Sequence, residues 1–205
     1  MKKIFVIITI LFLQSCVGGK KLNYYTLKVD DNFQKIDNRV LDINISKIDI
    51  LHYLDIPQII TIKNSKYELN LSENNRWVET FGKIIENSLI NILYKSFPYS
   101  NIKIEEFNRN YDINIQLKIN NFVAKFNDKA VLDAEWFIYD KNNKLIKHNK
   151  FYNSVIIDDT YVDLAKKYSK LLNEMLFLII TDLNKPSYVF KTSMKCYNYQ
   201  KVKMS

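Results

Sequence analysis

The chain has 205 residues, of which 47% are hydrophobic and 14% aromatic, and it carries a formal net charge of +8. This apolar content excludes an intrinsically disordered chain, and the length suits one well-buried domain better than two. The basic balance suggests a phosphate-rich partner, such as lipid headgroups or nucleic acid.

The first sixteen residues, MKKIFVIITILFLQSC, have the three parts of an export signal. Two lysines precede an apolar run, Ile4–Leu13, which is half of the ~20 residues that a membrane-spanning helix needs. The segment Leu13–Cys16 resembles the bacterial lipobox, in which a small residue precedes a cysteine whose thiol accepts diacylglycerol. We therefore expect cleavage before Cys16 and a covalent acyl anchor on it. The alternative is an ordinary secretory signal with an incidental cysteine.

Four regions follow from this interpretation: a signal peptide over 1–15, the acylated cysteine and a tether over 16–22, a domain over 23–184, and a basic tail over 185–205. Two or three acyl chains would hold the protein stably to a bilayer. Because no aspartate follows Cys16, the chain resembles lipoproteins sorted to the outer membrane more than those kept in the inner one. Export also argues against nucleic acid as a partner.

The first half of the domain predicts short strands and one long helix. Apolar and polar residues alternate over 41–46, and shorter strands are expected at 24–28, 58–63 and 66–71. Apolar residues recur at helical spacing over 76–96, with N-cap candidates over 72–75.

The second half predicts longer strands and a second helix. A short strand is expected at 101–105, and alternation is clear over 113–119 and 132–138; the turn 140–144 then leads to a returning strand, 145–156. The second helix should begin at Thr160, with Asp163 in a capping-box position. Its apolar C-terminal half, Met175–Ile180, predicts burial in the core or against another subunit.

The order of these elements predicts an α+β fold. We expect a mixed or antiparallel β-sheet with two long amphipathic helices packed on one face, in a single domain. The alternating strands further predict that the other face of the sheet is wet.

The last 21 residues carry five lysines and no acidic residue, with aromatic residues between them. This composition fits either a contact with a membrane surface or a solvated tail. Acylation of Cys16 would leave Cys196 without a partner in the chain, as a free thiol or an intermolecular link.

Residue types that support catalysis are not grouped in the sequence. His52 and His148 lie far apart, and the three glycines form no phosphate loop. The adjacent Asp158 and Asp159 are better explained as favourable charges at a helix start. We therefore expect no enzyme activity, no metal and no cofactor.

Three short segments are distinctive in combination: Tyr24–Leu27, Leu54–Ile59 and Arg76–Glu79. Behind a lipidated cysteine and in this order, they resemble the Tyr-Tyr-x-Leu, Leu-Asp-x-Pro-Gln-Ile and Arg-Trp-x-Glu segments of the ABC-type transport auxiliary lipoproteins, the PqiC-like family. The resemblance extends from about residue 23 to about 183. Ile56 and Thr80 stand where the family commonly has arginine and proline.

This resemblance implies a periplasm-facing lipoprotein accessory to an MCE-type lipid transport system. Its partners would be an MCE-domain protein and a membrane permease, with a homo-oligomeric ring as a further possibility. The candidate interface residues are Asp55, Pro57, Gln58, Arg76 and Trp77, although core packing explains Trp77 better. A free-standing lipid carrier is the alternative; it predicts a large apolar cavity, whereas an accessory subunit predicts a filled core.

Overall fold

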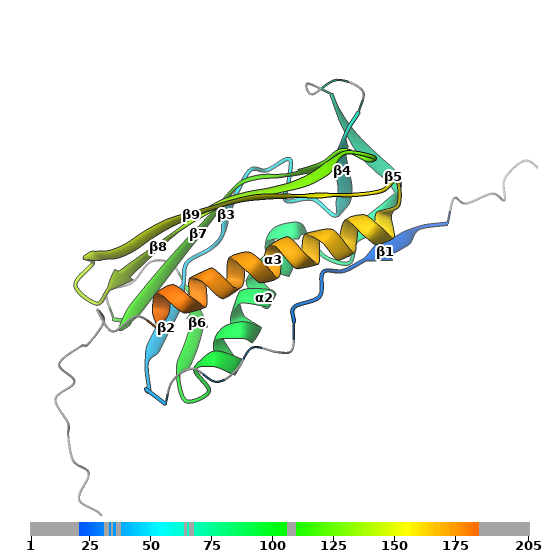
Figure 1. Ribbon diagram of the computed structural model, residues 1–205. Helices are drawn as coiled ribbons and strands as arrows, with labels where there is room; N and C mark the ends of the chain where they lie inside the picture. Colours follow the sequence, from blue (N-terminus) through cyan, green and yellow to red (C-terminus); the bar gives the residue numbers. More distant parts are fainter. Residues whose placement is uncertain are drawn as a thin grey trace, which may run out of the picture.

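The computed structural model describes residues 21–184, except 31–32, 34, 36–37, 64, 66–67 and 106–109. The predicted signal peptide, Cys16, most of the tether, the basic tail and Cys196 lie outside these residues. Element labels follow Figure 1.

One mixed sheet forms the framework of the described domain (Figure 1). Its strands are β1 (Asn23–Tyr25), β2 (Asp42–Ile45), β3 (Asp49–Ile50), β4 (Gln58–Ile62), β5 (Leu69–Trp77), β6 (Asn101–Ile104), β7 (Ile113–Ala124), β8 (Lys129–Asp140) and β9 (Leu145–Ile156).

The long strands β7, β8 and β9 form an antiparallel meander, and β7 is the strand around which the rest of the sheet is built. Along its other edge β7 pairs in parallel with β2, β3 and β4 in turn. β4 continues antiparallel into β5, β1 pairs in parallel with β5, and β6 pairs in parallel with β2. Strands from both halves of the chain thus meet on β7.

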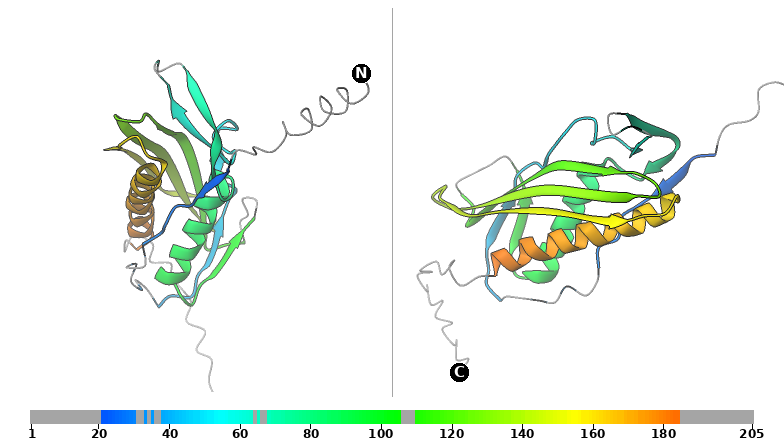
Figure 2. Two further views of the ribbon diagram at one scale, coloured as in Figure 1. Left: turned by 90° about the vertical axis from the view of Figure 1, so that its right-hand side faces the viewer. Right: turned by 45° about the horizontal axis from the view of Figure 1, so that its top comes forward.

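Two helices, α2 (Phe81–Ser96) and α3 (Tyr161–Leu183), lie on the same side of the sheet (Figures 1 and 2). The predicted α+β fold is confirmed, including the shared face of the two helices. Most of the apolar second half of α3 is buried in the chain's own core, although Phe177 and Leu178 are exposed. Neither described helix is long and apolar enough to cross a membrane.

The start of α3 is the one that the sequence predicts. Thr160 is the N-cap, and its hydroxyl accepts a hydrogen bond from the Asp163 amide at 3.1 Å. The Asp163 carboxylate reaches back to the amide of Asp158 rather than to that of Thr160. The Thr160 amide is instead bound by the Asp158 carboxylate at 2.7 Å.

The predicted start of the first helix is wrong by five residues, because α2 begins at Phe81 and not at residue 76. The Trp77 amide donates to the Pro57 carbonyl at 2.7 Å, and the Val78 amide donates to the Tyr25 carbonyl at 2.9 Å. These bonds to neighbouring strands hold Arg76–Val78 extended. The N-cap is Thr80, outside the predicted 72–75.

The expectation that polar strand residues face water is wrong where β2 meets β7. Asn44 and Asn114 are fully buried, and the Asn44 amide donates to the Asn114 side chain at 3.1 Å. The Asn44 oxygen also accepts from the Glu105 amide at 3.0 Å. Because these buried polar groups bond one another and the backbone, the sheet tolerates them on a covered face.

Aromatic rings fill the space between sheet and helices. The Phe122 ring of β7 stacks between Phe81 of α2 and Tyr168 of α3, with centroid distances of 3.5 and 3.6 Å. The Tyr168 hydroxyl is buried without a hydrogen-bond partner, and burial raises the pKa of this phenol well above its usual range.

We therefore expect Tyr168→Phe to raise the free energy of unfolding by about 1 kcal/mol, because it removes a buried polar group that gains no bond. The control is Tyr111→Phe, which removes a hydroxyl that donates to Glu105 at 2.7 Å and should not stabilise. Urea unfolding measures both, and stabilisation by Tyr111→Phe alone would contradict the prediction.

Candidate functional site

The three distinctive segments, which lie between residues 24 and 79 of the sequence, meet at the end of β5. Tyr24 and Tyr25 of β1 lie in register with Arg76 and Trp77 of β5. From the other side, Gln58 of β4 is the partner of Arg76. Folding therefore brings all three segments into one junction, which the sequence pattern did not predict.

Asp55 holds the N-terminus of α2 at this junction. Thr80 makes no side-chain cap, and the Gly82 amide instead donates to the Asp55 carboxylate at 2.9 Å. A negative charge placed here also favours the helix dipole. A Cβ on Gly82 would lie 2.8 Å from Asp55 Oδ1, so glycine is what lets the carboxylate approach. Asp55 thus has a structural role in addition to its place among the predicted interface residues.

A double-mutant cycle tests this contact. Asp55→Ala should cost about 1 kcal/mol, as loss of a helix cap does. Gly82→Ala should cost at least as much in the wild-type background, because the new Cβ displaces the carboxylate. In the Asp55→Ala background the same glycine change should be neutral or stabilising, since alanine is the better helix former. Thermal unfolding measures the four proteins, and additive effects would contradict the contact.

The other predicted interface residues differ in what they offer to a partner. Trp77 is only 3% exposed and packs in the core, whereas Pro57, Gln58 and Arg76 are half-buried. The Nε atom of Arg76 is buried without a hydrogen-bond partner. Of the five residues, Gln58 and Arg76 keep a polar side chain without an evident structural task.

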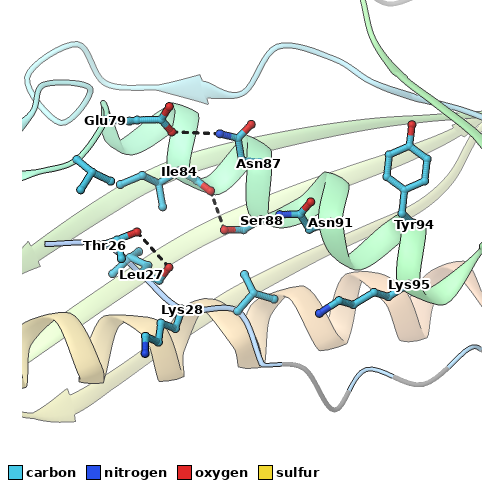
Figure 3. A pocket seen from close by; sticks show the side chains of 12 residues that line it. Thr26, Leu27, Lys28, Glu79, Ile84, Asn87, Ser88, Asn91, Tyr94 and Lys95 are labelled. Atoms are coloured by element: carbon cyan, nitrogen blue, oxygen red, sulfur yellow. Dashed lines mark hydrogen bonds between the residues drawn. The ribbon is translucent and has the colours of Figure 1, made fainter.

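A groove of about 760 Å³ runs beside the junction, between α2 and the segment Thr26–Val29 that follows β1 (Figure 3). Two hydrogen bonds join this segment to α3: the Lys28 backbone amide donates to the Ser169 hydroxyl, and the Asn173 side-chain amide donates to the Lys28 carbonyl. Buried residues at the groove are Leu27, Ile84 and Ser88.

The rim of the groove is polar. Glu79, the last residue of the third distinctive segment, is held by the Asn87 amide at 3.1 Å, and Asn91, Tyr94 and Lys95 follow along α2 (Figure 3). These α2 residues were not among the predicted site residues, although Asn87 and Asn91 are spaced one helical turn apart. A mixed lining of this kind suits a polypeptide segment or a polar headgroup better than an acyl chain alone.

A second polar cluster lies on the sheet face away from the helices. Glu135 of β8 bonds His148 at 3.2 Å, and Lys118 and Lys150 lie within 3.8 Å of it. The hydrogen bond from His148 and the nearby lysines lower the pKa of the Glu135 carboxyl. The His148 ring also stacks on Phe137 at 4.3 Å, and its side chain is 37% exposed, so this histidine belongs to a surface network.

Within the described ranges, no three histidine, cysteine, aspartate or glutamate side chains are grouped as metal ligands would be. The groove and the junction beside it are thus the candidate site, as a binding surface.

The chain is similar in sequence to one protein family and in fold to solved structures. The family model described as "ABC-type transport auxiliary lipoprotein component" matches residues 25–178. No curated protein matches the chain. A crystal structure of an uncharacterized protein superimposes with a TM-score of 0.63 at 15% identity, covering 80% of this chain and 99% of its own. A Xanthomonas campestris protein of the DUF330 family gives a TM-score of 0.63 at 11% identity, covering 79% and 95%. At these identities the two structures share the fold.

Proposed function

Since the chain belongs to the family of ABC-type transport auxiliary lipoproteins, we propose that it is the docking subunit of an MCE-type, Pqi-like intermembrane lipid transport system. Acyl chains on Cys16 anchor it to the envelope facing the periplasm, in the outer membrane rather than the inner one. Its partners are an MCE-domain protein and the associated membrane permease, and a homo-oligomeric ring is one arrangement in which it meets them. It makes and breaks no bond.

The tight packing of the described core beside Tyr168 favours docking over lipid carriage. The cavity beside Tyr168, between Leu54, Trp77 and Phe122, has a volume of only about 10 Å³, which is about the space of one water molecule. An acyl chain needs far more room, and ligand pockets span roughly 300–1,000 Å³. The groove on α2 has that volume, but its polar rim fits a protein segment better than a lipid tail.

We further propose that the groove receives a segment of the partner. Leu27 of the first distinctive segment lies in one wall, and Glu79 of the third lies on the rim. The second segment supports the other wall, α2, because Asp55 binds the Gly82 amide at the start of this helix. All three segments therefore contribute to one surface.

Affinity purification of the full-length lipoprotein from detergent-solubilised membranes, followed by mass spectrometry, tests the proposal. We expect an MCE-domain protein or its permease to co-elute with the wild type. The Cys16→Ala variant shows whether anchoring is needed for assembly. Elution of the protein alone with stoichiometric phospholipid would favour the carrier and overturn docking.

A matched pair of variants tests the groove. Asn91→Arg places a long side chain in the groove from an exposed position on α2, and co-elution of the partner should fall at least about tenfold, as at a binding hot spot. Asn142→Arg makes the same change at the exposed turn between β8 and β9 and should leave co-elution unchanged. Equal recovery with both variants would place the partner elsewhere.

A further inference from the structure

One end of the domain is built from three neighbouring segments. The Tyr161 ring, at the start of α3, meets Tyr25 of β1 at 5.9 Å and Phe126 of the β7–β8 turn at 5.0 Å. The Ile157 amide donates to the Asp128 carbonyl at 3.2 Å, which joins the end of β9 to the same turn. We call residues 21–25, 125–129 and 156–162 the anchor end, and Figures 1 and 2 show them together where the described chain begins.

Apolar side chains stand out from the anchor end. Ile156 is 81% exposed, Val162 54% and Tyr24 58%, and Leu22 is exposed beside them. Ile156 is the most exposed large hydrophobic residue of the described chain. Single exposed apolar residues are normal, but four of them on two neighbouring segments at the same end form a surface.

The length of the tether limits what this surface can meet. Cys16 precedes Leu22 by six residues, and an extended chain spans at most about 3.6 Å per residue. An acylated Cys16 would therefore keep the anchor end within roughly 20 Å of the bilayer surface. The other end of β9, at Leu145, lies about 35 Å further along the strand, at ~3.3 Å per residue.

We propose that the anchor end rests on the bilayer, with Ile156 and Val162 inserted among the lipids and Tyr24 at headgroup depth. This inference rests on the proposed function in one respect, since it needs the anchor on Cys16. Aliphatic side chains and tyrosine are the residues that such an interface favours. The anchor end has three acidic groups: Asp158 bonds Thr160, Asp128 pairs with Lys125, and Asp159 is exposed. The exposed Lys21 and Lys129 can meet lipid phosphates.

Fluorescence quenching tests the proposal with two variants on one strand. Full-length acylated Ile156→Trp and Leu145→Trp are reconstituted in phosphatidylethanolamine–phosphatidylglycerol vesicles, with or without bromine on the acyl chains. The indole introduced at 156 should be quenched about two-fold by the brominated lipid, and the one introduced at 145 should not be quenched. Leu145 is itself 47% exposed, and the native Trp77 and Trp136 are buried and give the same background in both proteins.

Equal quenching of the two variants, or no quenching at 156, would overturn the proposal. Intact mass measured before reconstitution shows whether Cys16 carries its acyl chains, and an unmodified cysteine would overturn both this inference and the proposed anchoring. If quenching is confined to 156 while no transport protein co-elutes in the affinity experiment, the membrane contact stands and the docking function fails.

Discussion

Replacing Asp182 by alanine is expected to lower the free energy of unfolding by about 3 kcal/mol, the cost of breaking a buried charged network. Asp182 lies at the end of α3 and is only 2% exposed. Its Oδ2 atom accepts from Trp136 Nε1 at 3.1 Å and from the Asn149 amide at 2.6 Å, and Lys147 lies 3.9 Å from Oδ1. The alanine variant would leave the wholly buried Trp136 N–H without this acceptor.

The same carboxylate explains how α3 is fixed to the sheet. A negative charge near a helix C-terminus opposes the helix dipole, so its bonds to β8 and β9 must outweigh that cost. Asp182→Asn keeps an acceptor oxygen but loses the charge, and it should be less damaging than alanine. Asp159→Ala, at an exposed position, should change stability by no more than about 0.5 kcal/mol. Urea unfolding distinguishes these proteins, and similar losses for Asp182→Ala and Asp159→Ala would refute the role.

Replacing Trp77 by alanine is expected to cost about 3–5 kcal/mol and to lower the melting temperature by about 10 °C. The Trp77 ring lies 6.3 Å from Phe81, 6.4 Å from Phe122 and 6.3 Å from Tyr168, measured between centroids. It therefore links β5 to both helices and to β7, and alanine would leave a large cavity among them.

This substitution also separates the two roles considered for Trp77. As a core residue, Trp77 should tolerate phenylalanine far better than alanine, and Tyr24→Ala on the adjacent β1 should cost little because Tyr24 is exposed. Thermal unfolding followed by circular dichroism gives the stabilities. A Trp77→Ala protein that melts like the wild type but loses its partner in the affinity experiment would show that Trp77 is an interface residue.

Several elements could be predicted from sequence because their determinants are local. The alternation of 145–156 after the turn 140–144 predicted both ends of β9 as observed, and Thr160 with Asp163 predicted the start of α3 at Thr160, which is its N-cap. The short strand β3 was not predicted, because two residues carry no measurable period. The lipobox and the three distinctive segments are likewise recognised from residues that are neighbours in the sequence.

The start of α2 and the shape of the candidate site needed the tertiary structure. Arg76–Val78 fit a helical period as well as a strand, and the choice depends on carbonyls of Pro57 and Tyr25, which lie far away in sequence. The cap of α2 likewise comes from Asp55, 27 residues before Gly82. No spacing rule connects these positions.

The sequence by itself determined the fold class, the long strands, the second helix and the family resemblance, because hydrophobic period, turn chemistry and capping act over a few residues. It also favoured a core position for Trp77, which the structure confirms. Only the tertiary structure decided that Asp55 is a cap and that the distinctive segments meet beside a groove on α2. Those outcomes depend on which backbone and side-chain groups meet after strands from both halves of the chain pair with β7, and pairing over such separations leaves no local pattern to predict from.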